Sequence, residues 1–334
     1  MILSNIGVRT AISVLVLCAA VAYLVARDEC CSMDSNLLLA TAALQPVNML
    51  VIATVGWRFI LLAHPPRPTF WSSLKASTLA TGLNIIAPAR GGDFIRLTYL
   101  RQREGTPLGI GLSISIIERV ADLIVLSAMA IIVASLVLQS KIIVPIVAIS
   151  ALGVGLIILS ALLPLWLAIL RRIFPAAVAA FLTSVTTETA ARIRDGKIFL
   201  ALAASALYMG LGLVATLIFF RIATEQEFSL TLAAMVLVFA SLGGAIPILP
   251  GGLATFEAGV IAALMYGGYS ASDALKLAVV YRLQQYVLAT PLALLVASRE
   301  RVGLSAMFSE MFRLLTNRRM PPDLPPTSST NENH

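Results

Sequence analysis

The sequence predicts an all-α, polytopic membrane protein with about six transmembrane helices and two re-entrant helical hairpins in an inverted-topology repeat. Three observations lead to this prediction. Hydrophobic residues make up 59% of the 334 positions and charged residues only 12%, whereas soluble domains are about half apolar and about a quarter charged. Several apolar segments are long enough to cross a bilayer. Two further apolar stretches are broken by proline and glycine.

The long apolar segments are the predicted transmembrane helices. A spanning helix needs about 20 mostly apolar residues, because the hydrocarbon layer is roughly 30 Å thick and each residue rises about 1.5 Å. The first segment has no small-residue cleavage site, so we expect an uncleaved span rather than a signal peptide. The segments that meet the length requirement are residues 8–26, 37–62, 108–138, 142–170, 198–220 and 273–297.

The basic residues between these segments indicate the orientation. If the amino terminus is cytoplasmic, most lysines and arginines flank the spans on the cytoplasmic side, and only Arg27, Lys141, Arg221 and Lys276 lie outside. The positive-inside rule favours this orientation, which places both termini in the cytoplasm. The same distribution accounts for the net charge of +7 without a role in nucleic-acid binding.

The two broken stretches, residues 76–89 and 231–267, are the predicted re-entrant hairpins. Both flanks of the first are cytoplasmic in this orientation, and both flanks of the second are external, so each should enter the membrane and return to the same side. Non-helical backbone at membrane depth is tolerated only where protein or a watery cavity satisfies its polar groups. The breaks therefore mark a cavity, and they fall at Asn84, Pro88, Pro247 and Pro250.

The order of these segments suggests a repeat. A span, a hairpin and a span make up residues 37–138, and the same order returns in the opposite orientation over residues 198–297. The first half carries Arg90-Gly91-Gly92-Asp93 and then Glu118-Arg119, and the second carries Pro250-Gly251-Gly252, Glu257 and then Tyr281-Arg282. Inverted repeats of this kind bind their substrate near the midplane, where broken helices meet. Two unrelated proline–glycine kinks are the alternative.

The predicted transmembrane domain covers residues 1–298. Between the two repeats, residues 174–197 combine apolar residues at helical spacing with charges beyond them, which predicts an interfacial helix on the cytoplasmic surface. Residues 299–334 are basic at first and then rich in proline, serine and asparagine. This composition predicts a disordered cytoplasmic tail.

Several charged residues fall inside the predicted spans. A lone charge at the bilayer centre costs about 2.5 kcal/mol or more, so such residues face the protein interior and pair or bind something. Glu118 and Asp122 share one helix face, while Arg119 points about 100° away. We therefore expect Arg119 to pair with another helix, through Asp93 or Glu257.

Arginine side chains and the backbone N–H groups of glycine turns suit a phosphate group. The alternative is a buried ion-pair network that only fixes helix packing. Arg96, Arg101 and Arg103 are expected at the cytoplasmic interface, where basic residues commonly meet anionic lipid. The predicted headgroup-binding residues are Arg90, Gly91, Gly92, Arg119, Gly251, Gly252 and Arg282, and the predicted charge partners or proton carriers are Asp93, Glu118, Asp122 and Glu257.

No metal or cofactor site is expected. The histidines are His64 at a span end and His334 at the terminus, so no histidine-based triad or metal cluster is expected in the membrane core. The cysteines have no partners at ligand spacing.

At these residues the sequence resembles the lysylphosphatidylglycerol synthase transmembrane region, also called the flippase-like domain family. The resemblance spans roughly residues 37–297 and rests on Asn84–Asp93 (NIIAPARGGD), Glu118–Asp122 (ERVAD), Leu249–Glu257 (LPGGLATFE) and Tyr281-Arg282. It implies lipid handling, because family members translocate aminoacylated phosphatidylglycerol or are linked to polyprenyl-phosphate sugars and hopanoid metabolism. Lysyl transfer from tRNA is not expected, because no soluble catalytic domain follows the last span.

The leading prediction is a non-enzymatic lipid translocase of the bacterial inner membrane. It would move an anionic phospholipid or a polyprenyl-phosphate-linked lipid between leaflets, and its partners would be membrane lipids and envelope-lipid synthesis enzymes. One alternative is a polytopic polyprenyl-phosphate-dependent glycosyltransferase, in which Asp28 and Glu29 would be an external acidic pair. Another is a non-catalytic scaffold for envelope-lipid synthesis, including that of hopanoids.

Overall fold

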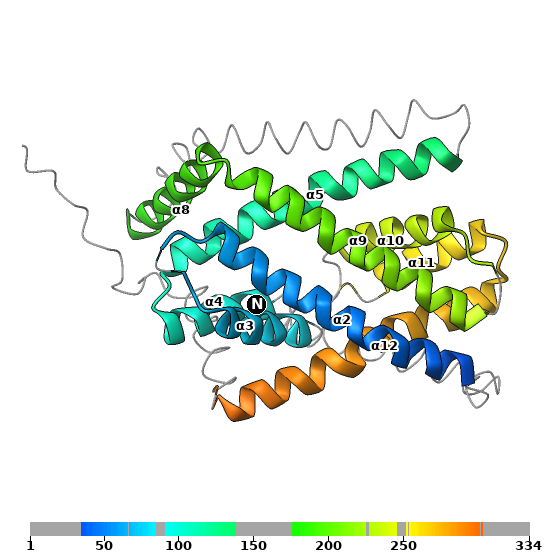
Figure 1. Ribbon diagram of the computed structural model, residues 1–334. Coiled ribbons are helices and arrows are strands. Elements are labelled where there is room, and N and C mark those ends of the chain that lie inside the picture. The colour runs from blue at the N-terminus through cyan, green and yellow to red at the C-terminus, as the bar shows by residue number, and fades with distance from the viewer. Residues whose placement is uncertain are drawn as a thin grey trace, which may run out of the picture.

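The computed structural model describes residues 35–65, 67–84, 91–137, 176–224, 227–245, 252, 254–300 and 302. The described elements are all α-helices (Figure 1). Predicted spans 8–26 and 142–170 and most of the predicted tail lie outside these residues. In chain order the helices are α2 (Ser35–Leu62), α3 (Phe70–Leu83), α4 (Gly91–Glu104), α5 (Leu108–Val137), α8 (Ala176–Arg194), α9 (Lys197–Thr224), α10 (Leu230–Ala245), α11 (Thr255–Tyr266) and α12 (Ala271–Arg299).

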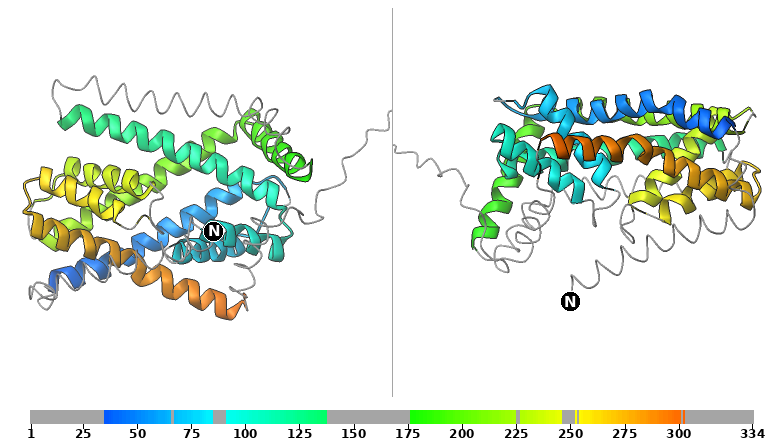
Figure 2. Two further views of the ribbon diagram at one scale, coloured as in Figure 1. Left: turned by 180° about the vertical axis from the view of Figure 1, so that it is seen from behind. Right: turned by 90° about the horizontal axis from the view of Figure 1, so that it is seen from below.

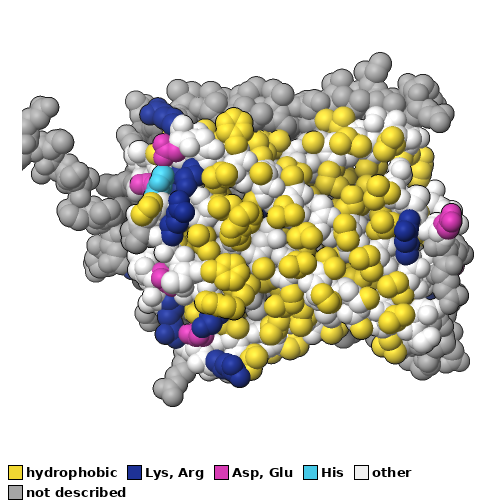
Figure 3. Space-filling model, viewed as in Figure 1, with side chains coloured by type: hydrophobic (Ala, Val, Ile, Leu, Met, Phe, Trp, Pro, Cys, Tyr) yellow, Lys and Arg dark blue, Asp and Glu magenta, His cyan; other side chains and the backbone are white. Residues whose placement is uncertain are grey.

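Helices α2, α5, α9 and α12 are the long elements of the molecule. They contain 28, 30, 28 and 29 residues and are apolar enough to cross a membrane. At about 1.5 Å per residue each exceeds the roughly 30 Å of hydrocarbon. They confirm four of the predicted spans. The space-filling view shows a broad hydrophobic surface between the two ends of the molecule (Figure 3), so the protein is a multi-helix membrane protein.

A pair of shorter helices lies at each of the two broken stretches. Helix α3 packs against α4, and α10 packs against α11. The two pairs lie toward opposite ends of the long helices in every view (Figures 1 and 2). The prediction placed the first hairpin at residues 76–89, but the helical pair extends to Glu104. The polar helix α4 can pack inside because Arg96 is neutralised by Glu118, as described below.

Close backbone contacts hold the helices of each pair together. A Cβ atom at Gly92 would collide with the carbonyl oxygen of Ala80 across the α3–α4 contact. In the second pair, a Cβ atom at Gly243 would collide with the backbone of Thr255, and one at Gly259 with the backbone of Phe239. Small residues allow this approach where helices associate in membranes.

Helix α8 lies where α9 begins and runs across the direction of the long helices (Figure 2). The buried Arg192 donates from Nε to the carbonyl oxygen of Leu62 at 3.3 Å, and Lys197 donates from Nζ to that of Leu61 at 2.8 Å. These carbonyls belong to the last turn of α2, and the carbonyl oxygens of a last turn receive no hydrogen bond from N–H groups of the helix itself. Two cations therefore cap the negative end of α2.

The two ends of the molecule differ in charge. Basic side chains gather at the end where α3, α8 and α9 begin (Figure 3). Exposed aromatic residues stand near this end at Trp71 and Phe199, and Tyr266 is exposed where α11 ends, toward the other end. Aromatic residues concentrate at membrane–water interfaces and basic residues on the cytoplasmic side. The basic end is therefore the end that the positive-inside rule predicts to face the cytoplasm.

At the basic end, Glu300 fastens the end of α12 to the first hairpin. Lys75 of α3 donates to Glu300 Oε1 at 2.5 Å, and Nη2 of Arg103 in α4 lies 2.8 Å from Oε2. The hydrogen bond from Lys75 lowers the pKa of the Glu300 carboxyl, burial opposes that shift, and the charges of Lys75 and Arg103 add to the lowering. The carboxylate is therefore favoured in its ionised form.

The hydrophobic core is divided into two clusters along the long helices. One cluster surrounds α10, α11 and the start of α12. The other surrounds α3, α4 and the start of α5. On α5 the two clusters are separated between Ala121 and Leu126, and on α12 between Tyr281 and Ala293. Polar residues fill the space between the two clusters, and the candidate site lies there.

Candidate functional site

A polar cavity of about 240 Å³ opens between the two apolar clusters. An engineered cavity of roughly 150 Å³ holds benzene, so this one has room for a small polar headgroup. Five helices and the end of α3 contribute to its wall. The lining residues are Val55, Arg58, Ala80, Thr81, Asn84, Asp93, Arg96, Arg119, Asp122, Tyr208, Arg282, Gln285 and Tyr286.

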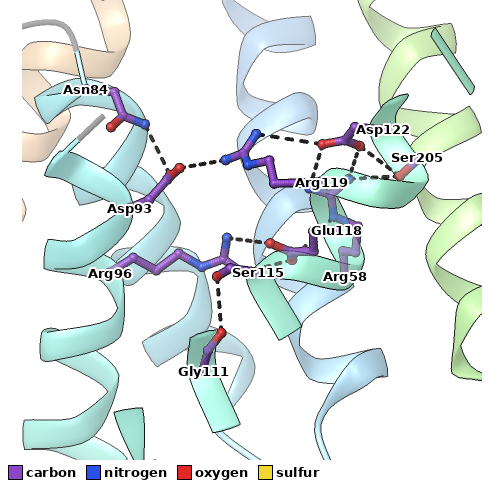
Figure 4. A network of polar contacts seen from close by, with 10 residues as sticks. All are labelled: Arg58, Asn84, Asp93, Arg96, Gly111, Ser115, Glu118, Arg119, Asp122 and Ser205. Carbon is purple, nitrogen blue, oxygen red and sulfur yellow. Dashed lines mark hydrogen bonds and ion pairs between the residues drawn. The ribbon is translucent and has the colours of Figure 1, made fainter. Parts of the chain in front are cut away.

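The deepest part of the site is a buried ion-pair network (Figure 4). Arg96 of α4 donates from both terminal nitrogens to Glu118 of α5, at 3.0 and 2.9 Å. Arg58 of α2 lies between the two acids of α5, with Nε 3.3 Å from Glu118 and Nη1 2.5 Å from Asp122. Ser205 of α9 also donates to Asp122, at 2.8 Å. The network therefore ties four helices together.

The spacing of acids on α5 explains why one arginine serves both. Glu118 and Asp122 lie one turn apart on the same helix face, as predicted. Arg58, Arg96 and Glu118 are at most 3% exposed. Burial of so many charges costs less when each is paired and hydrogen-bonded. The bidentate contact from Arg96 meets that condition for Glu118.

Arg119 forms the accessible edge of the same network. Its Nη2 donates to Asp93 Oδ2 at 2.6 Å, which confirms the predicted pairing with Asp93. Asn84 donates to the other oxygen of Asp93 at 3.2 Å. The side chain of Arg119 is 43% exposed, much more than those of Arg58 and Arg96. Arg119 is therefore the most exposed of the described arginines that line the cavity.

The second half places a more weakly bonded pair in the cavity. Arg282 of α12 lines the wall, and its Nε lies 3.6 Å from Glu257 Oε1 of α11. Its guanidinium stands over the rings of Phe256 at 4.3 Å and Tyr286 at 5.2 Å. Neither oxygen of Glu257 accepts a hydrogen bond among the described residues, although both are buried.

The two pairs occupy matching places in the two halves. Asp93 lies in the first turn of α4, the second helix of its pair, and Glu257 lies in the first turn of α11, the second helix of its pair. Each acid contacts an arginine of the long helix that follows, Arg119 in α5 and Arg282 in α12. The order of elements and the contacts thus agree between the halves.

Residues 6–293 match the family model described as the lysylphosphatidylglycerol synthase TM region. The chain belongs to this family. The match confirms the resemblance seen at the glycine turns and the intramembrane charges. Neither a curated protein nor a solved structure matches the chain. The family assignment supports a membrane role connected with lipid.

Most of the predicted site residues that the structure describes meet in or beside the cavity. Asn84, Asp93, Arg119, Asp122 and Arg282 line it, and Glu118 and Glu257 stand behind the arginines. The described predicted glycines do not line it: Gly91, Gly92 and Gly252 are buried instead. The remaining predicted residues and the external acidic pair lie outside the described part of the chain. They are Arg90, Gly251, Pro88, Pro247 and Pro250, and Asp28 and Glu29.

The sequence reasoning missed two arginines at the centre of the site. Arg96 was expected at the cytoplasmic interface, and Arg58 was counted only among the basic residues that flank the spans on the cytoplasmic side. Both are buried in the ion-pair network. The sequence signal that could have revealed these arginines is the pair of acids Glu118 and Asp122. Two acids on one helix face, with Arg119 turned away, need cations from other helices.

Proposed function

We propose that this protein is a lipid translocase of the bacterial inner membrane. It moves a lipid with a phosphate-bearing headgroup, either an anionic phospholipid or a polyprenyl-phosphate-linked lipid, between the two leaflets. The headgroup occupies the polar cavity, and the acyl chains stay in the surrounding lipid. The protein acts as a carrier, not as an enzyme.

One observation carries this proposal. Arg119 presents a 43% exposed guanidinium to a cavity that lies between two apolar clusters of a membrane protein. Arginine binds phosphate with several charge-assisted hydrogen bonds. Arg58 and Arg96, which hold the ion-pair network together, are by contrast at most 3% exposed.

The arrangement of the two helix pairs supports alternating access. The pairs α3–α4 and α10–α11 lie toward opposite ends of the long helices (Figure 1). We propose that they are re-entrant hairpins that enter from opposite faces of the membrane, with both chain termini in the cytoplasm. Movement of one half against the other would then expose the central cavity to each face in turn.

The direct test uses proteoliposomes of phosphatidylcholine with a trace of fluorescent phosphatidylglycerol. Wild-type protein should move the label between leaflets. Arg119→Gln should lower the rate by about ten- to a hundredfold, because a hydrogen bond to a charged group contributes about 1.5–3 kcal/mol. Arg194→Gln is the matched control, because this arginine is exposed on α8, away from the cavity.

The outcomes separate the competing functions. If wild type, Arg119→Gln and Arg282→Gln move the label equally, the cavity is not the headgroup site. If none of them moves any phosphate-bearing lipid while a lipid-synthesis enzyme co-purifies with the protein, the scaffold role is favoured. Sugar transfer that is lost on changing Asp28 would instead support the glycosyltransferase.

A further inference from the structure

Glu257 differs from the other three carboxylates of the polar centre. Asp93 accepts hydrogen bonds from Arg119 and Asn84, Glu118 accepts two from Arg96, and Asp122 accepts from Arg58 and Ser205. Neither oxygen of Glu257 accepts a hydrogen bond from any described residue. Among the described residues, its ion-pair partner is Arg282, whose Nε lies 3.6 Å from Oε1.

The surroundings of Glu257 offer little else to hold a negative charge. The described helices that pack most closely on α11 are α10 and α12. Helix α10 has no titratable residue in its sequence, and neither does the connection of residues 246–254. The titratable groups of α12 at this position are Arg282 and the phenol of Tyr286. Among the described residues, Arg282 is the cation that pairs with Glu257, and a buried carboxylate without hydrogen bonds depends on such a cation.

That cation also faces the ligand. Arg282 lines the cavity, whereas Glu257 does not. If a phosphate bound Arg282 while Glu257 stayed ionised, two anions would share one guanidinium. One proton on Glu257 removes this conflict and keeps the total charge of the site constant when a singly charged anionic headgroup enters.

We propose that Glu257 takes up a proton when an anionic phosphate headgroup binds at Arg282, so that lipid and proton move together. This inference rests on the proposed translocase function and adds a driving force to it. The proton comes from water and adds to one Glu257 oxygen, and it returns to water when the headgroup leaves Arg282. The exchange is reciprocal: lipid binding favours the proton, and the proton favours lipid binding.

A helix-end role is the alternative for Glu257. It lies in the first turn of α11, where an acidic side chain is stabilised by the helix dipole. A carboxylate with only that role would stay ionised whether or not a ligand is bound. Proton uptake on binding therefore distinguishes the two roles.

The first experiment measures that uptake without any transport. Dihexanoyl phosphatidylglycerol is added to the full chain in detergent, in a weakly buffered solution with a pH indicator. Wild type should take up about one proton per bound lipid, and Glu257→Gln should take up none. Glu227→Gln is the matched control, because Glu227 is exposed ahead of α10, and it should behave like wild type. Binding without uptake, or no binding, overturns the proposal.

The second experiment measures coupling in phosphatidylcholine proteoliposomes with a trace of fluorescent phosphatidylglycerol. A pH difference should move the label toward the alkaline side, and its distribution should shift by up to about tenfold per pH unit. Glu257→Gln should abolish this shift, whereas Glu227→Gln should keep it. An unchanged shift in Glu257→Gln overturns the proposal.

The two experiments fail in different ways. If wild type moves the label but shows neither proton uptake nor a pH-driven shift, the coupling is wrong and the translocase function stands. If wild type takes up a proton on binding but never moves the label, Glu257 exchanges protons as proposed and the translocase function is wrong. Thermal unfolding of Glu257→Gln checks that the variant is folded.

Discussion

The two halves of the chain place an acid and an arginine at matching positions but surround them differently. In the first half, Asp93 and Arg119 join a network in which every carboxylate accepts at least one short hydrogen bond. In the second half, Glu257 and Arg282 stand 3.6 Å apart among aromatic rings. The first arrangement resists change because each charge has several partners. In the second, Glu257 accepts no hydrogen bond from a described residue and lies 3.6 Å from Arg282.

The largest expected effect tests how much the first network contributes. Arg58→Leu leaves Glu118 and Asp122 short of a cation in the protein interior, and the loss of one partner of a buried pair costs about 3–5 kcal/mol. We expect a large drop in the thermal unfolding temperature in detergent. Arg282→Leu in the second half should cost less, because it removes the described cation of one carboxylate, Glu257, whereas Arg58→Leu removes a cation shared by two. Equal losses of stability in the two variants would contradict the difference between the two halves.

The close helix contacts should give the next largest effect. Gly259→Ala places a methyl group against the backbone of Phe239 in the second hairpin, and overpacking of this kind costs about 1–3 kcal/mol. Gly210→Ala in α9 is the matched control, because a Cβ atom there meets nothing within 4 Å. The control should be neutral or slightly stabilising in a helix. Destabilisation by both variants would contradict the contact argument.

A smaller difference is expected between the two matching acids. Asp93→Asn weakens a 2.6 Å ion pair, and we expect a loss of about 1–2 kcal/mol because both side chains are partly exposed. Glu257→Gln should change stability by less than about 1 kcal/mol, since no described hydrogen bond is lost. Chemical or thermal unfolding of both variants in one detergent checks the ranking. A larger loss of stability in Glu257→Gln than in Asp93→Asn would contradict this ranking.

The smallest effect concerns Glu300, which fastens α12 to the first hairpin. Its carboxyl pKa is lowered in the folded protein, so the contribution to stability is present above the ordinary pKa and is lost as the pH falls through the folded value. Glu300→Gln should lower stability at neutral pH by at most about 1 kcal/mol, because the pair is partly exposed. Wild type and variant should converge in acid. A constant difference at every pH would show that charge is not the cause.

Apolar length and intramembrane charge were readable from the sequence because both follow from the cost of burial in lipid. They predicted six spans, of which the described residues contain four, and a partner for Arg119 on another helix, either Asp93 or Glu257, of which Asp93 makes the contact. The burial of Arg58 and Arg96 in the ion-pair network could not be predicted in the same way. Their neighbours in sequence are typical of an interface, and their burial depends on acids 64 and 22 positions away. The extent of α4 was missed for the same reason, because its polar face is neutralised only by tertiary contacts.

The position of Arg58 has a consequence for the biosynthesis of the protein. Arg58 lies about one turn before the end of α2, and its acidic partners on α5 are made only after the first hairpin has followed. While the chain is being inserted, a long arginine side chain near a helix end can reach the aqueous interface. The Arg58 side chain can then move to its buried position once α5 has been inserted. Insertion of α2 and α5 is therefore coupled, and chains shortened before Glu118 should leave α2 poorly anchored in the bilayer.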